Sequence, residues 1–169
     1  MGMTPTQFFE AFVVGNADDC RMNPGCVRRA FNASVAAFHL ADHYQEYYRL
    51  NKPELVSQYK SKGDYVEYVC LQTNGAFRDI QSIANAYKHL YTDTDPKKAR
   101  YTTVSSPAAI ESIEINERGL DITAISHEYT TETNFRSFVS FTRTDGSKSE
   151  FLPILDVVVR FWYYELNKV

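Results

Sequence analysis

The sequence predicts an α+β protein, mainly a helical bundle of four or five helices with a small antiparallel β-meander inserted before the C-terminal helix. Apolar residues recur at helical spacing through much of residues 4–91 and again over 153–167. Apolar and polar residues alternate through much of residues 108–152, which is the period of half-buried strands. We therefore expect one domain over residues 1–169, with these three segments as its parts.

The first part of the chain predicts a short helix followed by a long one. Thr4 is a suitable N-cap, Pro5 suits the first helical position, and Gly15-Asn16 is expected to end the helix. Residues 16–25 then read as a loop. A helix from about 25 to 50 follows, because four apolar residues recur there at helical spacing: Val27, Phe31, Val35 and Phe38.

Asn51-Lys52-Pro53 breaks that helix, and the pattern predicts a shorter helical piece over 54–60 and another long helix over 64–91. Gly75 is a position where the long helix can bend. Residues 111–126 predict a strand pair around a turn at 116–119, and residues 135–152 predict another around Asp145-Gly146. In the closing helix one face carries the apolar residues, which are Leu155, Val159, Trp162 and Leu166.

Charge and cysteine content narrow the function classes. The net charge is -3, so the overall field does not favour nucleic acid or an anionic membrane. The longest late apolar stretch, residues 151–162, contains a proline and two charged residues, so we expect no membrane span. Three cysteines cannot all pair within one chain, which favours a reducing, cytoplasmic location.

The predicted helix over 64–91 carries a polar stripe. Arg78, Ser82, Asn85 and His89 are spaced by 4, 3 and 4 residues and so lie on one helical face. Each can donate a hydrogen bond, which suits holding a phosphate or a base edge, or transferring a proton. The alternative is a polar network that fixes helix packing, with Arg78 paired to Asp42 or Glu46.

The helix over 25–50 carries a second polar group, formed by His39, Asp42 and His43. The two histidines are one helical turn apart, so they can hold a metal if another helix adds carboxylates. The alternative is that both are half-buried and hydrogen-bonded to tyrosine hydroxyls or the backbone. We expect no metal and no cofactor, and we expect this group to meet Arg78, Asn85 and His89 between the two long helices.

Two segments carry a resemblance to known proteins. Residues 37–43, AFHLADH, and residues 83–90, IANAYKHL, resemble the paired His-Leu-x-Asp-Trp and Ile-Ala-Asn-x-x-Lys-His motifs of uncharacterised bacterial and phage-borne proteins. His43 stands where that group tends to carry Trp, and Ser82 stands where it often has Asp. The Asn85-x-x-x-His89 ending is more distantly similar to the HEPN superfamily, many of whose members are metal-independent RNases of toxin or antiphage systems.

These observations give two functional expectations. The first is a cytoplasmic accessory or phage-associated protein that binds a partner, with a possible homodimer. The second, which the resemblance implies, is a HEPN-like RNase or RNA-binding protein. In that case His89 is the acid or base beside Asn85, and Arg78 reaches phosphate only through a dimer partner. The remaining candidate binding residues are His39, Asp42, His43, Ser82 and Lys88.

Overall fold

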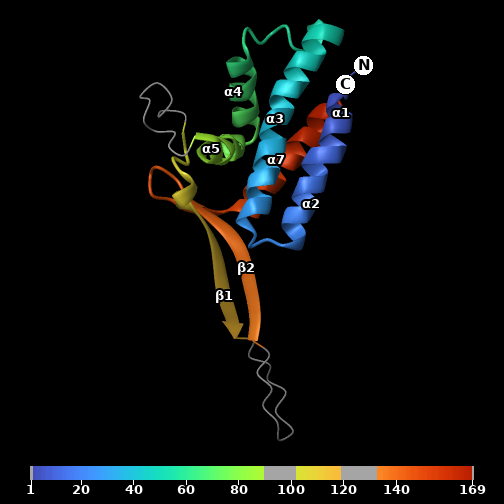
Figure 1. The fold of residues 1–169 in the computed structure, drawn as a ribbon. Helices are drawn as coiled ribbons and strands as arrows, with labels where there is room; N and C mark the ends of the chain where they lie inside the picture. Colours follow the sequence, from blue (N-terminus) through green and yellow to red (C-terminus); the bar gives the residue numbers. More distant parts are fainter. Residues whose placement is uncertain (1, 90–101, 119–132, 169) are drawn as a thin grey trace, which may run out of the picture.

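The computed structural model describes residues 2–89, 102–118 and 133–168. Within these ranges the predicted class is confirmed: helices dominate, and a three-stranded antiparallel sheet precedes the C-terminal helix. Figure 1 shows the helices gathered in one body and the first two strands projecting from it as a long ribbon. In the described ranges no helix is both long and apolar enough to cross a membrane.

The N-terminal helical segment is longer than predicted. Helix α1 (Pro5–Phe8) continues through a π-helix, η1 (Phe9–Val14), into α2 (Gly15–Met22). Thr4 caps it as expected, with a capping box to Gln7. The predicted stop at Gly15-Asn16 is wrong, because Ala17 and Cys20 are fully buried by packing against the next helix.

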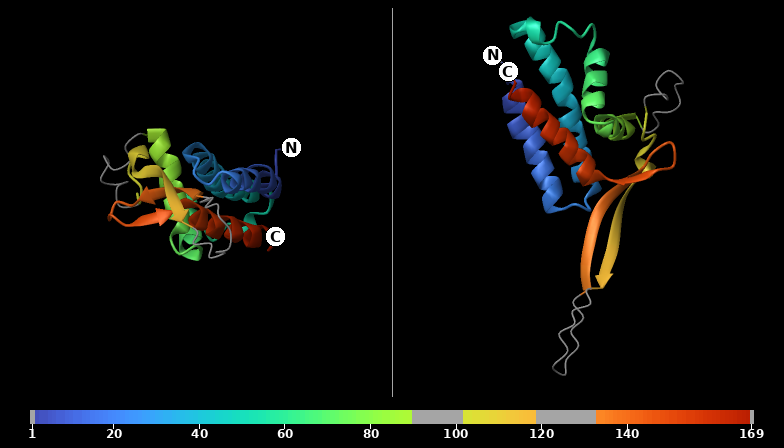
Figure 2. Two further views of the ribbon diagram at one scale, coloured as in Figure 1. Left: turned by 90° about the horizontal axis from the view of Figure 1, so that it is seen from below. Right: turned by 180° about the vertical axis from the view of Figure 1, so that it is seen from behind.

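Helix α3 (Val27–Asn51) confirms the predicted helix over 25–50 and lies at the centre of the body. The predicted helical piece over 54–60 is reduced to one 3-10 turn, η2 (Pro53–Leu55). Figure 2, seen from behind, shows α1 and α2 side by side with the closing helix.

The predicted helix over 64–91 is two helices, α4 (Lys62–Gln72) and α5 (Ala76–His89), which run in different directions. The chain turns between them because Asn74 and Gly75 have φ angles of 49° and 84°. The Thr73 hydroxyl then accepts a hydrogen bond of 3.1 Å from the Phe77 backbone N–H and so caps α5. Residues 90–91 lie outside the described residues.

The sheet has the order β1-β2-β3, with β1 at Ile110–Arg118, β2 at Thr133–Thr142 and β3 at Lys148–Glu150. A 3-10 turn, η3 (Pro107–Ala109), leads into β1. The Asp145-Gly146 hairpin is confirmed, with Gly146 at φ 84°. The turn predicted at 116–119 is wrong, since β1 stays paired with β2 as far as Arg118. The strand predicted beyond residue 119 lies outside the described residues.

The closing helix, α7 (Phe151–Leu166), packs against α3, α5 and β2. It begins two residues before Pro153, which is tolerated in the first helical turn because it needs no hydrogen-bonded N–H there. The predicted apolar face is confirmed at Leu155, Trp162 and Leu166. Val158 is fully buried as well, whereas Val159 is only partly buried.

The loop between α2 and α3 fixes the base of the ribbon. The Val139 N–H donates to the Pro24 carbonyl at 2.9 Å, and the chain at Gly25 passes close to Ser137. A Cβ at position 25 would lie 2.7 Å from Ser137 Oγ and 2.8 Å from Ser137 Cβ. Only glycine fits at position 25 without displacing Ser137, because it has no Cβ.

This close approach predicts that Gly25→Ala lowers the free energy of unfolding by roughly 1–3 kcal/mol, as overpacked sites do. The matched control is Gly15→Ala, in a helix where a Cβ would meet nothing within 4 Å. That change should raise stability by about 0.5–1 kcal/mol. Urea unfolding of both variants measures the two effects, and equal effects of the same sign would contradict the prediction.

Candidate functional site

The residues of the polar stripe on α5 have different partners and do not form one group. The half-buried Arg78 forms an ion pair with Glu67 of α4 and donates to the Gln81 side chain at 2.9 Å. The buried Ser82 hydroxyl accepts a hydrogen bond of 3.0 Å from the Thr103 N–H. Pairing of Arg78 with Asp42 or Glu46 was one expectation, and it is wrong. Glu67 pairs with the guanidinium because the turn at 73–75 brings α4 into contact with the first turn of α5.

The rest of the stripe occupies the end of α5. Asn85 is half-buried and Lys88 is exposed. His89 is the last residue of α5, and its side chain lies outside the described residues. Its predicted role as acid or base therefore stays a prediction.

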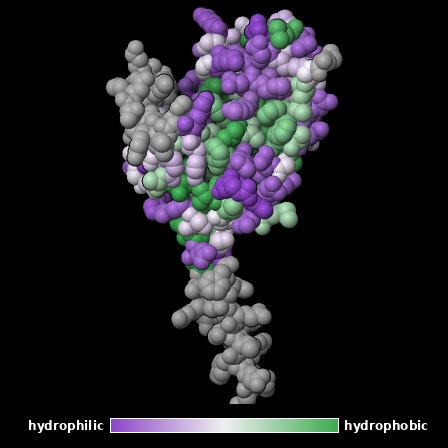
Figure 3. All heavy atoms as spheres, viewed as in Figure 1, coloured by the Kyte–Doolittle hydropathy of each residue, from purple (hydrophilic) through white to green (hydrophobic). Residues whose placement is uncertain are grey.

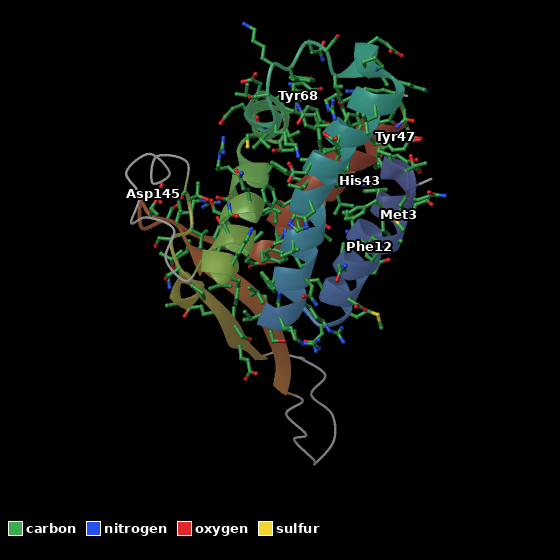
Figure 4. The ribbon with its side chains drawn as sticks, turned by 45° about the horizontal axis from the view of Figure 1, so that its top comes forward. Met3, Phe12, His43, Tyr47, Tyr68 and Asp145 are labelled. Atoms are coloured by element: carbon green, nitrogen blue, oxygen red, sulfur yellow. The ribbon has the colours of Figure 1, made fainter. Side chains whose placement is uncertain are left out.

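The second polar group faces another part of the molecule. His43 Nε2 lies 2.7 Å from the Met3 carbonyl, and its ring stacks on Phe8 of α1 at 5.1 Å between centroids. Figure 4 shows His43 on the side of α3 that faces α1, whereas α5 lies on the other side of α3 in Figure 1. The expected convergence of His43 with the α5 residues is therefore wrong.

Asp42 and His39 do not complete a site with His43 either. Asp42 lies 3.9 Å from Lys62 at the start of α4, and His39 is exposed. Of the two alternatives for the histidines, His43 matches the half-buried, backbone-bonded one. Within residues 2–89, 102–118 and 133–168, no three His, Cys, Asp or Glu side chains are grouped as metal ligands.

An ion pair that the sequence analysis missed joins α5 to the sheet. Asp79 is 4% exposed, and its carboxylate accepts from Arg143 Nε at 3.0 Å and from Nη2 at 2.6 Å. Arg143 also donates to Ser149 at 2.7 Å, and its guanidinium lies 5.0 Å from the centre of the Phe141 ring. This bidentate pair fixes the β2–β3 hairpin to the helical body.

A signal for that pair exists in the sequence. Asp79 falls on the same helical face as three buried residues of α5, which are Ser82, Ile83 and Ala86. A carboxylate on an otherwise buried face requires a cation or several donors, because an unpaired buried charge is costly. The sequence does not reveal which of its many basic residues supplies the cation.

The two buried cysteines, Cys20 and Cys70, show no sign of a reactive site. Cys70 is buried in the core as its apolar helical face predicts, and burial raises the pKa of its thiol to about 11. Burial likewise raises the pKa of the Cys20 thiol to about 11. Both groups are therefore thiols rather than nucleophilic thiolates at neutral pH.

The ribbon formed by β1 and β2 projects from the helical body. Strand β3 pairs only with Ser140–Thr142, so the outer part of the ribbon has two strands. One face places Ile113 directly opposite Phe138, and Ile115 opposite Arg136. The Ile115 side chain is 42% exposed, and Arg136 stacks over Phe138 at 5.4 Å. Figure 3 shows hydrophobic side chains at the surface where the ribbon leaves the body.

The free edge of β1 adds backbone groups to this surface. In the described part of the sheet, β1 is an outermost strand and pairs on one side only, with β2. Glu111 and Glu114 are exposed along it, and Glu111 forms an ion pair of 3.1 Å with Lys148. We call this edge, together with Ile113, Ile115 and Phe138, the ribbon surface. It combines unpaired backbone groups, apolar side chains and carboxylates.

Comparison with known proteins adds no identification, since no family model, no curated protein and no solved structure matches this chain.

Proposed function

We propose that the protein is a partner-binding module, and that it binds a protein segment along the ribbon surface. The observation that carries the proposal is the projecting ribbon, in which the outer edge of β1 pairs with no other described strand and the isoleucines of β1 are partly exposed. An exposed strand edge can take an extended segment as an additional strand. Main-chain hydrogen bonds then supply affinity, and alternate side chains supply specificity.

The side chains of β1 indicate the chemistry of the partner. Ile113 and Ile115 favour branched or aromatic residues on the facing side of the added strand. Glu111 and Glu114 favour basic residues, because opposite charges across a strand pair are stabilising. The sequence of β1 contains three glutamates and one arginine, so two copies of β1 side by side would bring carboxylates together. A basic segment of another protein is thus favoured over a homodimer through this edge.

Site-specific crosslinking tests the surface directly. A photo-crosslinking phenylalanine derivative at position 115 should capture a protein from a lysate of the source organism. The matched control is position 71, where Leu71 is 74% exposed on α4. Capture at position 115 but not at 71 identifies the partner; capture of RNA, or equal capture at both positions, contradicts the proposal.

The captured partner then allows a quantitative test. Ile115→Lys should weaken its binding by at least about tenfold, since the change removes an apolar contact and adds a desolvated charge. Leu71→Lys should leave the affinity unchanged. Equal affinity of Ile115→Lys and the wild-type chain would mean that the ribbon surface is not the binding site.

The RNase alternative stays a prediction and has less support. The Arg78 guanidinium is held by Glu67 and Gln81, which leaves it less available to phosphate. Cleavage of mixed RNA by the wild-type protein, lost in His89→Ala without loss of helix content, would favour that alternative over the binding module.

A further inference from the structure

A groove of about 430 Å³ lies between the N-terminal helical segment and α7, on the helical body rather than on the ribbon. Its apolar lining comes from Phe9 and Val14 of η1 and from Val159 of α7. Tyr163 and Tyr164 line it as well, and they are 56% and 61% exposed. The volume falls within the range of small-molecule sites, about 300–1,000 Å³.

The two arginines that line the groove differ in their partners. Arg21 donates to Asp18 at 2.7 Å and to Asp156 at 2.6 Å, so two carboxylates neutralise it. The exposed Arg160 also lines the groove, and within the described ranges it forms no hydrogen bond or ion pair. Arg160 is therefore the arginine of this groove that has no carboxylate partner within the described ranges, and it lies one helical turn from both Tyr163 and Tyr164.

One wall of the groove is the π-helix η1. A π-helix is rare, and such segments are frequent at functional sites. Here the segment contributes Phe9 and Val14 to the groove while Val13 stays in the core at 1% exposed. The irregular helix thus supplies residues to both the groove and the core.

We propose that this groove binds a small aromatic anion, of the size and charge of a nucleoside monophosphate. Arg160 is the group that binds the phosphate or carboxylate, because a guanidinium fits such anions with two parallel hydrogen bonds. Tyr163 and Tyr164 line the groove and are more than half exposed, so they are available to contact the aromatic part of the ligand. This site does not depend on the function proposed for the ribbon.

Calorimetric titration of the full chain with four probes tests the proposal. Adenosine 5′-monophosphate and phenyl phosphate carry both a ring and an anion, whereas adenosine lacks the anion and inorganic phosphate lacks the ring. At least one aromatic anion should bind saturably, and at least about tenfold more tightly than either partial probe. No saturable binding, or equal binding of inorganic phosphate, would overturn the proposal.

Substitutions locate the binding in the groove. Arg160→Gln should weaken binding of the aromatic anion by at least about tenfold. Arg160→Lys should recover part of that affinity, because lysine keeps the charge but lacks the planar guanidinium. The matched control is Arg28→Gln, at an exposed arginine of α3. Circular dichroism confirms that each variant is folded. Equal affinity of Arg160→Gln and the wild-type chain would overturn the assignment.

Discussion

Arg143→Ala will lower the free energy of unfolding by about 3 kcal/mol or more, although Arg143 lies near a surface hairpin. The reason is its partner: removing the guanidinium leaves the carboxylate of Asp79, whose side chain is 5% exposed, without its cation. The loss also removes the donors that join α5 to the β2–β3 hairpin. Urea unfolding at neutral pH measures the effect.

The matched control is Arg136→Ala on the ribbon. Arg136 also forms an ion pair, with Glu150 at 3.1 Å, but both side chains are more than one-third exposed. Exposed ion pairs contribute about 0–1 kcal/mol to stability, so the free energy of unfolding of this variant should stay close to that of the wild type. Similar losses in Arg136→Ala and Arg143→Ala would show that burial of Asp79 does not govern the energy of the pair.

Trp162→Ala will lower the free energy of unfolding by about 3–5 kcal/mol, which is the range for large aromatic residues removed from a core. Trp162 is fully buried on α7 and lies in edge-on contact with Phe77 of α5, with ring centroids 6.2 Å apart. Tyr44 of α3 is also within ring contact, at 6.0 Å. The substitution therefore opens a cavity where α3, α5 and α7 meet.

Tyr163→Ala is the control for that experiment, because the neighbouring ring is 56% exposed and its removal opens no core cavity. We expect a change within about 0.5 kcal/mol, as at most surface positions. A loss below 1 kcal/mol for Trp162→Ala in urea unfolding would mean that α7 does not form part of the core.

Local pattern was sufficient for much of the fold. The helix around Val27–Asn51, the Thr4 cap, the Asp145-Gly146 hairpin and the buried face of α7 were all predicted, because each depends on residues within a few positions of one another. Gly75 was recognised as a bend. The complete break into two helices was not predicted, since Asn74 adopts a positive φ that its residue type allows but does not require.

The candidate sites were predicted less well, because a shared helical face says nothing about which neighbour covers it. Spacing correctly placed Arg78 and Ser82 on one helix. The turn at 73–75, however, brings Glu67 to Arg78, and residues 102–106 bring the Thr103 N–H to the Ser82 hydroxyl. His43 contacts Met3 and Phe8 because the N-terminal segment packs along that side of α3.

The sequence by itself determined the α+β class, most element types and the apolar faces, since helical and strand periods are properties of neighbouring residues. The tertiary structure alone decided the extension of α2 past Gly15, the pairing of Asp79 with Arg143, and the groove beside Arg160. The last two join residues far apart in the chain: Asp79 and Arg143 are separated by 64 positions, and Arg21 and Asp156 by 135. Burial and ion pairing between such residues depend on how the helices pack, which no local pattern specifies.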